Sequence, residues 1–196
     1  MRIGICGIKQ SDTTDLIEGF RKIWPSYKID AGALVLFDEM TAEVQYKQLN
    51  ERIDKAMLYN KTKNVLHLNT SLDSLANIFW GAAKEIEGFD DHMIQKGIHL
   101  TRQSMTFYDV LFYLPITDKT YTEEKGLELD NFYNVILESY ATGKKWIFPF
   151  DDVNGTPPMI EIFGNVEEKL EMIKLYVNID GESYSSKDSL INEAIS

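Results

Sequence analysis

The sequence predicts an α/β domain of three layers, in which helices cover both faces of a central parallel sheet of about five strands. Short apolar runs alternate along the chain with longer stretches whose apolar residues recur at helical spacing. This alternation is typical of parallel strands joined by helices. The length of 196 residues and a hydrophobic fraction of 44% suit one folded domain with a buried core.

The alternation starts at the beginning of the chain. Residues 2–6 (RIGIC) predict a buried strand that runs into Gly7 and a polar loop, and a helix follows through about Phe20. Residues 41–58 predict a long helix, because apolar side chains recur there every three or four positions. Residues 64–68 (NVLHL) predict the next strand.

The middle of the chain repeats the pattern. An apolar stripe from Leu72 to Ile86 predicts one helix, and residues 90–106 predict a second. Residues 110–114 (VLFYL) form a continuous apolar run that ends at Pro115. Such a run is expected of a strand that is buried on both faces.

The region after this strand is more polar. Residues 116–130 predict a lid-like insertion rich in charged side chains, and a helix follows through about Tyr140. Two short apolar runs, at 146–148 and 160–163, predict the late strands of the sheet.

A last core helix is predicted through about Val177, because Asn165 and Glu168 have the spacing of an N-cap and its third helical residue. We therefore expect a single domain over residues 1–182. The serine-rich residues 183–196 are expected to form a C-terminal tail or a short helix.

Composition excludes several classes of function. The chain carries 20 Lys and Arg against 31 Asp and Glu, a net charge of −11, which argues against a broad phosphate-binding surface for nucleic acid. We expect no membrane association, because no window approaches the roughly 20 apolar residues of a spanning helix. Cys6 is the only cysteine, which rules out an internal disulfide or a cysteine-based zinc site. We read no signal peptide, so a cytoplasmic location is expected, in the host cytoplasm if the protein is viral.

The first strand–loop–helix is where ligands of parallel α/β sheets are sought first. Here it matches the phosphate-loop pattern G-x-x-x-x-G-K-[ST] only in part. Gly7 and Thr14 fall on the first and last positions, but Asp12 replaces the second glycine and Thr13 replaces the lysine. The full segment is Gly7-Ile8-Lys9-Gln10-Ser11-Asp12-Thr13-Thr14.

Both replacements remove phosphate-binding chemistry. The glycine lets the backbone approach a phosphate, and the lysine carries positive charge to it. Asp12 instead is expected at a helix N-terminus, in the favoured cap position, where its carboxylate fills the anion site. Lys9 is a possible substitute for the lost charge. The alternative interpretation is a capped strand-to-helix turn with no ligand.

Together with the rest of the chain, this loop resembles the P-loop nucleoside and nucleotide kinases, in particular deoxynucleoside monophosphate kinases and small AAA-type kinase domains, including bacteriophage ones. The likeness spans about residues 1–178 and depends on the order and spacing of four segments. These are RIGICGIKQSDTTDLIEGFRKIWP, QYKQLNERIDKAMLYNKTKNVLHLNTSLDSLANIFW, YDVLFYLPI and IEIFGNVEEKLEMIKLYV.

The chain departs from this family at its functional positions. The family has a magnesium-binding Asp and an Arg after the strand that ends near residue 68, and the matching residues here are Leu68 and Asn69. Leucine cannot ligate magnesium, which requires oxygen ligands. The family lid carries arginines, whereas the matching stretch offers Lys119 and Lys125 among many acids. These losses are hard to reconcile with ordinary phosphoryl transfer.

A possible pocket would be lined by Asn69, Asp73, Arg102, Lys119 and Lys125. Asp73 matches a Leu-Asp element of the family, but it also lies three residues after Thr70, and we prefer the interpretation as a capping box. Arg102 either lines the pocket or forms a surface ion pair.

The histidines and Cys6 have structural interpretations. His67 is expected in the core or a pocket wall, and Cys6 is expected to be a small buried hydrophobe. His92 and His99 are seven residues apart, which does not suit a metal pair, so no metal site is predicted.

Three functional hypotheses follow. The first is a non-catalytic pseudokinase that binds a protein partner or a small ligand, or forms a homo-oligomer, and needs no cofactor. The second is an active, atypical (deoxy)nucleoside monophosphate kinase, in which ATP is the donor and Asp38, Asp109 or Asp118 holds Mg²⁺. The third is a structural or assembly component of a virus particle. A fold does not decide among these functions.

Overall fold

A computed structural model of the chain describes residues 1–7, 10–31, 41–115, 131–136, 138, 157–178 and 180, with the side chains of residues 10–13 excepted. Five strands in this part of the chain form one parallel sheet in the order β2-β3-β1-β4-β5. The strands are β1 (Arg2–Cys6), β2 (Lys28–Asp30), β3 (Val65–Leu68), β4 (Val110–Tyr113) and β5 (Met159–Glu161). This order differs from the 3-2-1-4-5-6 and 2-1-3-4-5 orders of dinucleotide-binding and flavodoxin-like sheets.

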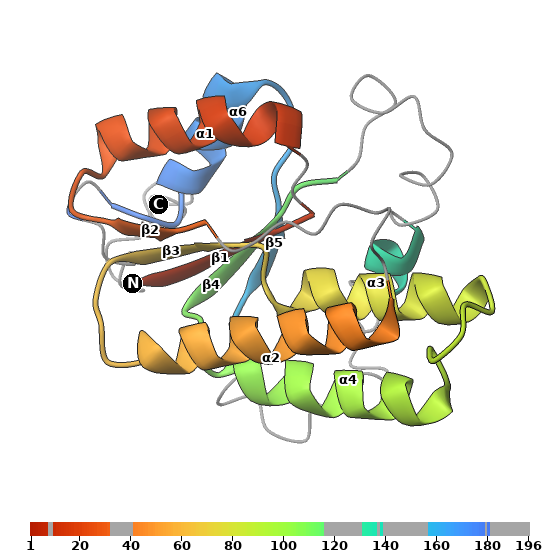
Figure 1. Ribbon diagram of the computed structural model, residues 1–196. Coiled ribbons are helices and arrows are strands. Elements are labelled where there is room, and N and C mark those ends of the chain that lie inside the picture. Colours follow the sequence, from red (N-terminus) through yellow and green to blue (C-terminus); the bar gives the residue numbers. More distant parts are fainter. Residues whose placement is uncertain are drawn as a thin grey trace.

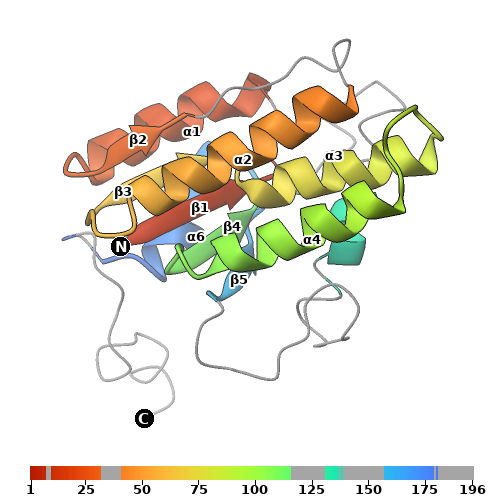
Figure 2. The same cartoon turned by 60° about the horizontal axis from the view of Figure 1, so that its bottom comes forward.

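Helices cover both faces of the sheet, as the sequence predicts (Figure 1). One face is covered by α1 (Gln10–Ile23) and α6 (Val166–Lys174), which contact each other. The other face is covered by α2 (Ala42–Leu58), α3 (Ser71–Ala83) and α4 (Asp91–Met105), which pack side by side (Figure 2). The predicted three-layer αβα architecture is therefore confirmed.

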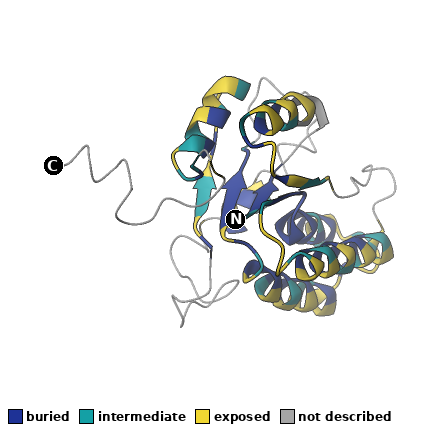
Figure 3. Cartoon of the chain, turned by 90° about the vertical axis from the view of Figure 1, so that its left-hand side faces the viewer, coloured by how far each residue is buried: buried dark blue, intermediate teal, exposed yellow. Residues whose placement is uncertain are grey.

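The sheet separates two apolar cores, and its central strands are dark with burial between the helical layers (Figure 3). Side chains alternate between the cores with the two-residue period of a strand. On β4, Val110 and Phe112 face the core beneath α1 and α6, and Leu111 and Tyr113 face the core beneath α2, α3 and α4. Burial on both faces explains why this strand is a continuous apolar run.

The predicted starts of α2, α3 and α6 agree with the structure, and a cap residue marks each of them. Thr41 and Thr70 cap α2 and α3. Asn165 and Glu168 form a complete capping box at α6: Asn165 N–H donates to the Glu168 carboxylate over 2.8 Å, and Glu168 N–H donates to Asn165 Oδ1 over 3.0 Å. Each bond satisfies an N–H group that has no partner within the helix.

Strand β2 was not predicted. Lys28–Asp30 has no apolar run, and its burial is partial, so no hydrophobic pattern marks it. Its position is set by pairing with β3, where Ile29 is opposite Leu66, and by the bond from Lys28 N–H to the Asn64 carbonyl over 2.8 Å. The predicted strand at 146–148, the lid at 116–130 and the tail at 183–196 lie outside the described residues.

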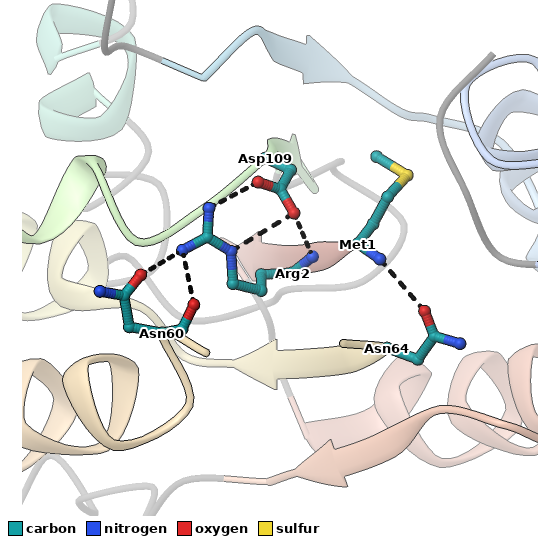
Figure 4. A network of polar contacts seen from close by, with 5 residues as sticks. All are labelled: Met1, Arg2, Asn60, Asn64 and Asp109. Atoms are coloured by element: carbon teal, nitrogen blue, oxygen red, sulfur yellow. Dashed lines mark hydrogen bonds and ion pairs between the residues drawn. The ribbon is translucent and has the colours of Figure 1, made fainter. Parts of the chain in front are cut away.

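Polar contacts join the chain start to the amino-terminal end of the sheet (Figure 4). The Arg2 guanidinium forms a 2.6 Å ion pair with Asp109, and its Nη1 donates to Asn60 Oδ1 over 2.5 Å. Asp109 is therefore engaged at the opposite end of the sheet from Gly7. Asp109 comes just before β4 and Gly7 just after β1, at opposite ends of these parallel strands, so the structure gives no support to the hypothesis that Asp109 holds Mg²⁺.

None of the helices in the described part of the chain combines the length and the apolar character that crossing a membrane requires.

Candidate functional site

The carboxyl ends of β1 and β3 lie next to each other, because Ile5 pairs with Leu68 in the parallel register. Each strand is followed by a residue with left-handed backbone geometry: Gly7 has φ of 80° and Asn69 has φ of 59°. Glycine adopts this geometry without strain, and asparagine tolerates it better than most residues. These turns lead into the N-terminal regions of α1 and α3, so the switch point of the sheet is formed by β1, β3 and the start of α3.

Asp73, in the first turn of α3, is the central polar group of this site. One carboxylate oxygen, Oδ1, accepts from Gly7 N–H over 2.9 Å and from the Tyr133 hydroxyl over 2.5 Å. The other oxygen, Oδ2, accepts from the Thr70 hydroxyl over 3.2 Å. Asp73 is only 6% exposed, so this carboxylate is bound by three neutral donors within the protein.

The capping-box interpretation is correct for Thr70 but does not account for the main contacts of Asp73. Thr70 is the N-cap, and its hydroxyl oxygen accepts from Leu72 N–H over 3.3 Å. The bonds that Asp73 makes instead connect α3 to Gly7 and to the helical residues 131–136. Asp73 therefore joins three segments, rather than serving only the start of its own helix.

The charge on Asp73 affects the acidity of its neighbours. Burial, and secondly the nearby Asp73 carboxylate, raise the pKa values of the Tyr133 and Tyr108 hydroxyls. The same two causes raise the pKa of the Cys6 thiol, which donates to the Phe112 carbonyl over 3.6 Å. Cys6 is buried, as predicted, and a buried protonated thiol is a poor nucleophile.

Arg52 of α2 contacts the start of α3, next to Asp73. The sequence did not predict a role for it. Its Nη1 donates to the Thr70 carbonyl over 3.0 Å and to the Ser74 hydroxyl over 2.7 Å. This ties α2 to the start of α3. The signal in the sequence was an arginine on the buried stripe of α2, between Leu49 and Ile53.

A second polar cluster lies one strand away, where His67 of β3 meets Asp30 of β2. His67 is buried, as predicted, and its Nδ1 lies 3.2 Å from Asp30 Oδ2. Lys55 Nζ lies 3.3 Å from the other oxygen of Asp30. The hydrogen bond from His67 and the charge of Lys55, opposed by partial burial, leave the pKa of Asp30 below its ordinary value of 3.8.

This cluster predicts a pH dependence of stability. Because the pKa of Asp30 is lower in the folded protein than in the unfolded chain, the carboxylate stabilises the fold above pH of about 4, and this contribution disappears as the pH falls through the folded pKa. We expect Asp30→Asn to be less stable than wild type at neutral pH and to lose less stability on acidification. Urea unfolding between about pH 7 and pH 2 measures this difference. If the free energy of unfolding changed with pH in the same way for both proteins, the prediction would be contradicted.

Of the other predicted site residues, Asn69 lies beside Gly7 at the carboxyl ends of β1 and β3, and Arg102 lies on α4. Asn69 is buried at the strand end, and its Nδ2 donates to the Ala31 carbonyl over 3.3 Å. Arg102 is half-buried on α4, and burial lowers the pKa of its guanidinium. Thr14 is exposed on α1. The side chains of Ser11, Asp12 and Thr13, and residues Lys9, Asp38, Asp118, Lys119 and Lys125, lie outside the described residues.

The backbone of the first loop corrects one prediction. Helix α1 begins at Gln10, so only residues 8 and 9 separate it from Gly7. Asp12 is thus in the first helical turn rather than at the predicted cap position. In the phosphate-loop pattern the helix would begin near Asp12, which leaves more backbone N–H groups free to face an anion.

Within the described ranges, no three His, Cys, Asp or Glu side chains gather in a way that could hold a metal ion. Comparison with known protein families and with curated proteins finds no match for this chain.

Proposed function

We propose that the chain is a non-catalytic, kinase-like domain that binds a protein partner or a small ligand at the carboxyl end of its sheet. The observation that carries the proposal is the Asp73 carboxylate, which lies 2.9 Å from the backbone nitrogen of Gly7. Its three described donors are neutral, so none of them cancels its charge.

A buried carboxylate at this position disfavours phosphate. A phosphate oxygen about 4 Å from it would be repelled by roughly 4 kcal/mol at an effective dielectric constant of 20. A phosphate site needs compensating cations, and the sequence has Thr13 where the phosphate-loop pattern has a lysine. Both features support the proposal that this site neither binds the phosphates of a nucleotide nor transfers them.

The end of β3 supports the same proposal. Leu68, at the position of the family's magnesium-binding Asp, is buried in the apolar core beneath α1 and α6. Asn69, at the position of the family's Arg, uses its amide nitrogen to hold the Ala31 carbonyl. Leu68 supplies no metal ligand, and Asn69 carries no positive charge with which to clamp a phosphate.

The proposal is tested by ADP release from ATP with a panel of nucleoside and deoxynucleoside monophosphates in the presence of Mg²⁺. We expect no release above the rate of a protein-free control. Turnover with any acceptor would overturn the proposal in favour of an atypical kinase. A stoichiometric co-purifying partner or a closed oligomer, without turnover, would support a binding or assembly role.

A further inference from the structure

Between α2 and α3 runs a row of buried polar side chains, in a place where apolar side chains are the rule. Gln45, Gln48 and Arg52 lie on the buried face of α2, three and four residues apart. Ser74 and Asn77 of α3 contact them across the seam. Gln45 is completely buried and Gln48 is 7% exposed, so each polar atom here depends on a partner inside the protein.

The two ends of this row are paired. Asn77 Nδ2 donates to Gln45 Oε1 over 3.2 Å, and Arg52 Nη1 donates to the Ser74 hydroxyl over 2.7 Å. Between them, Gln45 Nε2 and Gln48 Oε1 are buried and have no hydrogen-bond partner among the described residues. One atom is a donor and the other is an acceptor, and their residues are one turn apart on α2.

We propose that a single internal water molecule binds in this seam, accepting from Gln45 Nε2 and donating to Gln48 Oε1. A water molecule can both accept and donate a hydrogen bond through its single oxygen atom. Buried waters typically bridge polar groups that lack a protein partner.

The test compares Gln45→Met, Gln48→Met and the double variant by urea unfolding. Methionine keeps the length of the side chain and removes its hydrogen-bonding atoms. If water bridges the two amides, each single variant leaves the water with one partner fewer, and its unfolding equilibrium constant rises about fivefold. The unfolding constant of the double variant then rises by less than the product of the two single-variant increases. The reason is that the second substitution acts on a site that no longer holds water.

The opposite result is distinctive. If the two amides are buried without a guest, Gln48→Met relieves an unsatisfied polar atom and is more stable than wild type. Gln45→Met then still loses the hydrogen bond from Asn77, and the effects of the two substitutions are independent. Gln95→Met, at an exposed position on α4, is the matched control and is expected to be neutral. In wild-type protein, a nuclear Overhauser effect between water and the Gln45 amide protons is expected, and its absence would overturn the proposal even if a variant fails to fold.

Discussion

Replacing Asp73 with alanine is expected to lower the free energy of unfolding by about 3 kcal/mol or more. The substitution leaves Gly7 N–H, the Tyr133 hydroxyl and the Thr70 hydroxyl without their acceptor, and each buried donor left unpaired costs about 1–3 kcal/mol. Relief of the buried charge offsets part of this loss. For a chain of this size, the melting temperature should fall by about 6–12 °C.

Two further variants separate the charge of Asp73 from its hydrogen bonds. Asp73→Asn keeps an acceptor oxygen for Gly7 and Tyr133, and its amide group can donate to the Thr70 hydroxyl, so we expect a loss of about 1 kcal/mol. Tyr133→Phe removes one donor only and should cost about as much. Thermal unfolding measures all three variants. An alanine variant no less stable than the asparagine variant would contradict the role given to this carboxylate.

Replacing Gly7 with alanine is the second substitution with a large expected effect. At φ of 80° an added Cβ would meet the backbone oxygen of Leu114 inside van der Waals contact and would lie 2.8 Å from the Tyr113 ring. Left-handed geometry costs a non-glycine residue about 1–2 kcal/mol, and overpacking typically costs about 1–3 kcal/mol. We therefore expect unfolding to become easier by about 2–5 kcal/mol in urea titrations.

Gly97→Ala is the matched control for this substitution. Gly97 is helical, and its added Cβ would lie 3.0 Å from a terminal methyl of Ile78, which is free to shift slightly. Alanine is also a better helix former than glycine by about 1 kcal/mol. We expect this variant to stay within about 1 kcal/mol of wild type. Similar losses at Gly7 and Gly97 would show that backbone geometry at Gly7 is not the cause.

The parts of the fold that depend on local sequence were predictable. The apolar run before Gly7 and the run at residues 110–114 identify buried strands, because continuous burial requires continuous apolar sequence. Asn165 and Glu168 identify a helix start, since both bonds of the capping box form within three residues. Strand β2 could not be found in this way: its residues are partly exposed, and pairing with β3 determines its place.

The position of the candidate site was predictable from the sequence, but the hydrogen bonds within it were not. Its place at the end of β1 follows from the topology of parallel sheets. The partners of Asp73, however, are 66 residues away at Gly7 and 60 residues away at Tyr133. Sequence spacing shows only the local partner, Thr70, and so favoured a capping box. Arg52 was missed for the same reason, because its acceptors lie 18 and 22 residues further along the chain.

We propose that the switch point of this sheet does not bind nucleotides, and isothermal titration of the wild-type protein with ATP and GTP, each with and without Mg²⁺, is the decisive measurement. The Asp73 carboxylate beside Gly7, and the absence of a lysine at position 13, predict no binding tighter than about 100 µM, equivalent to about −5.5 kcal/mol. Binding tighter than this, strengthened by Mg²⁺, would overturn this proposal and favour the kinase hypothesis.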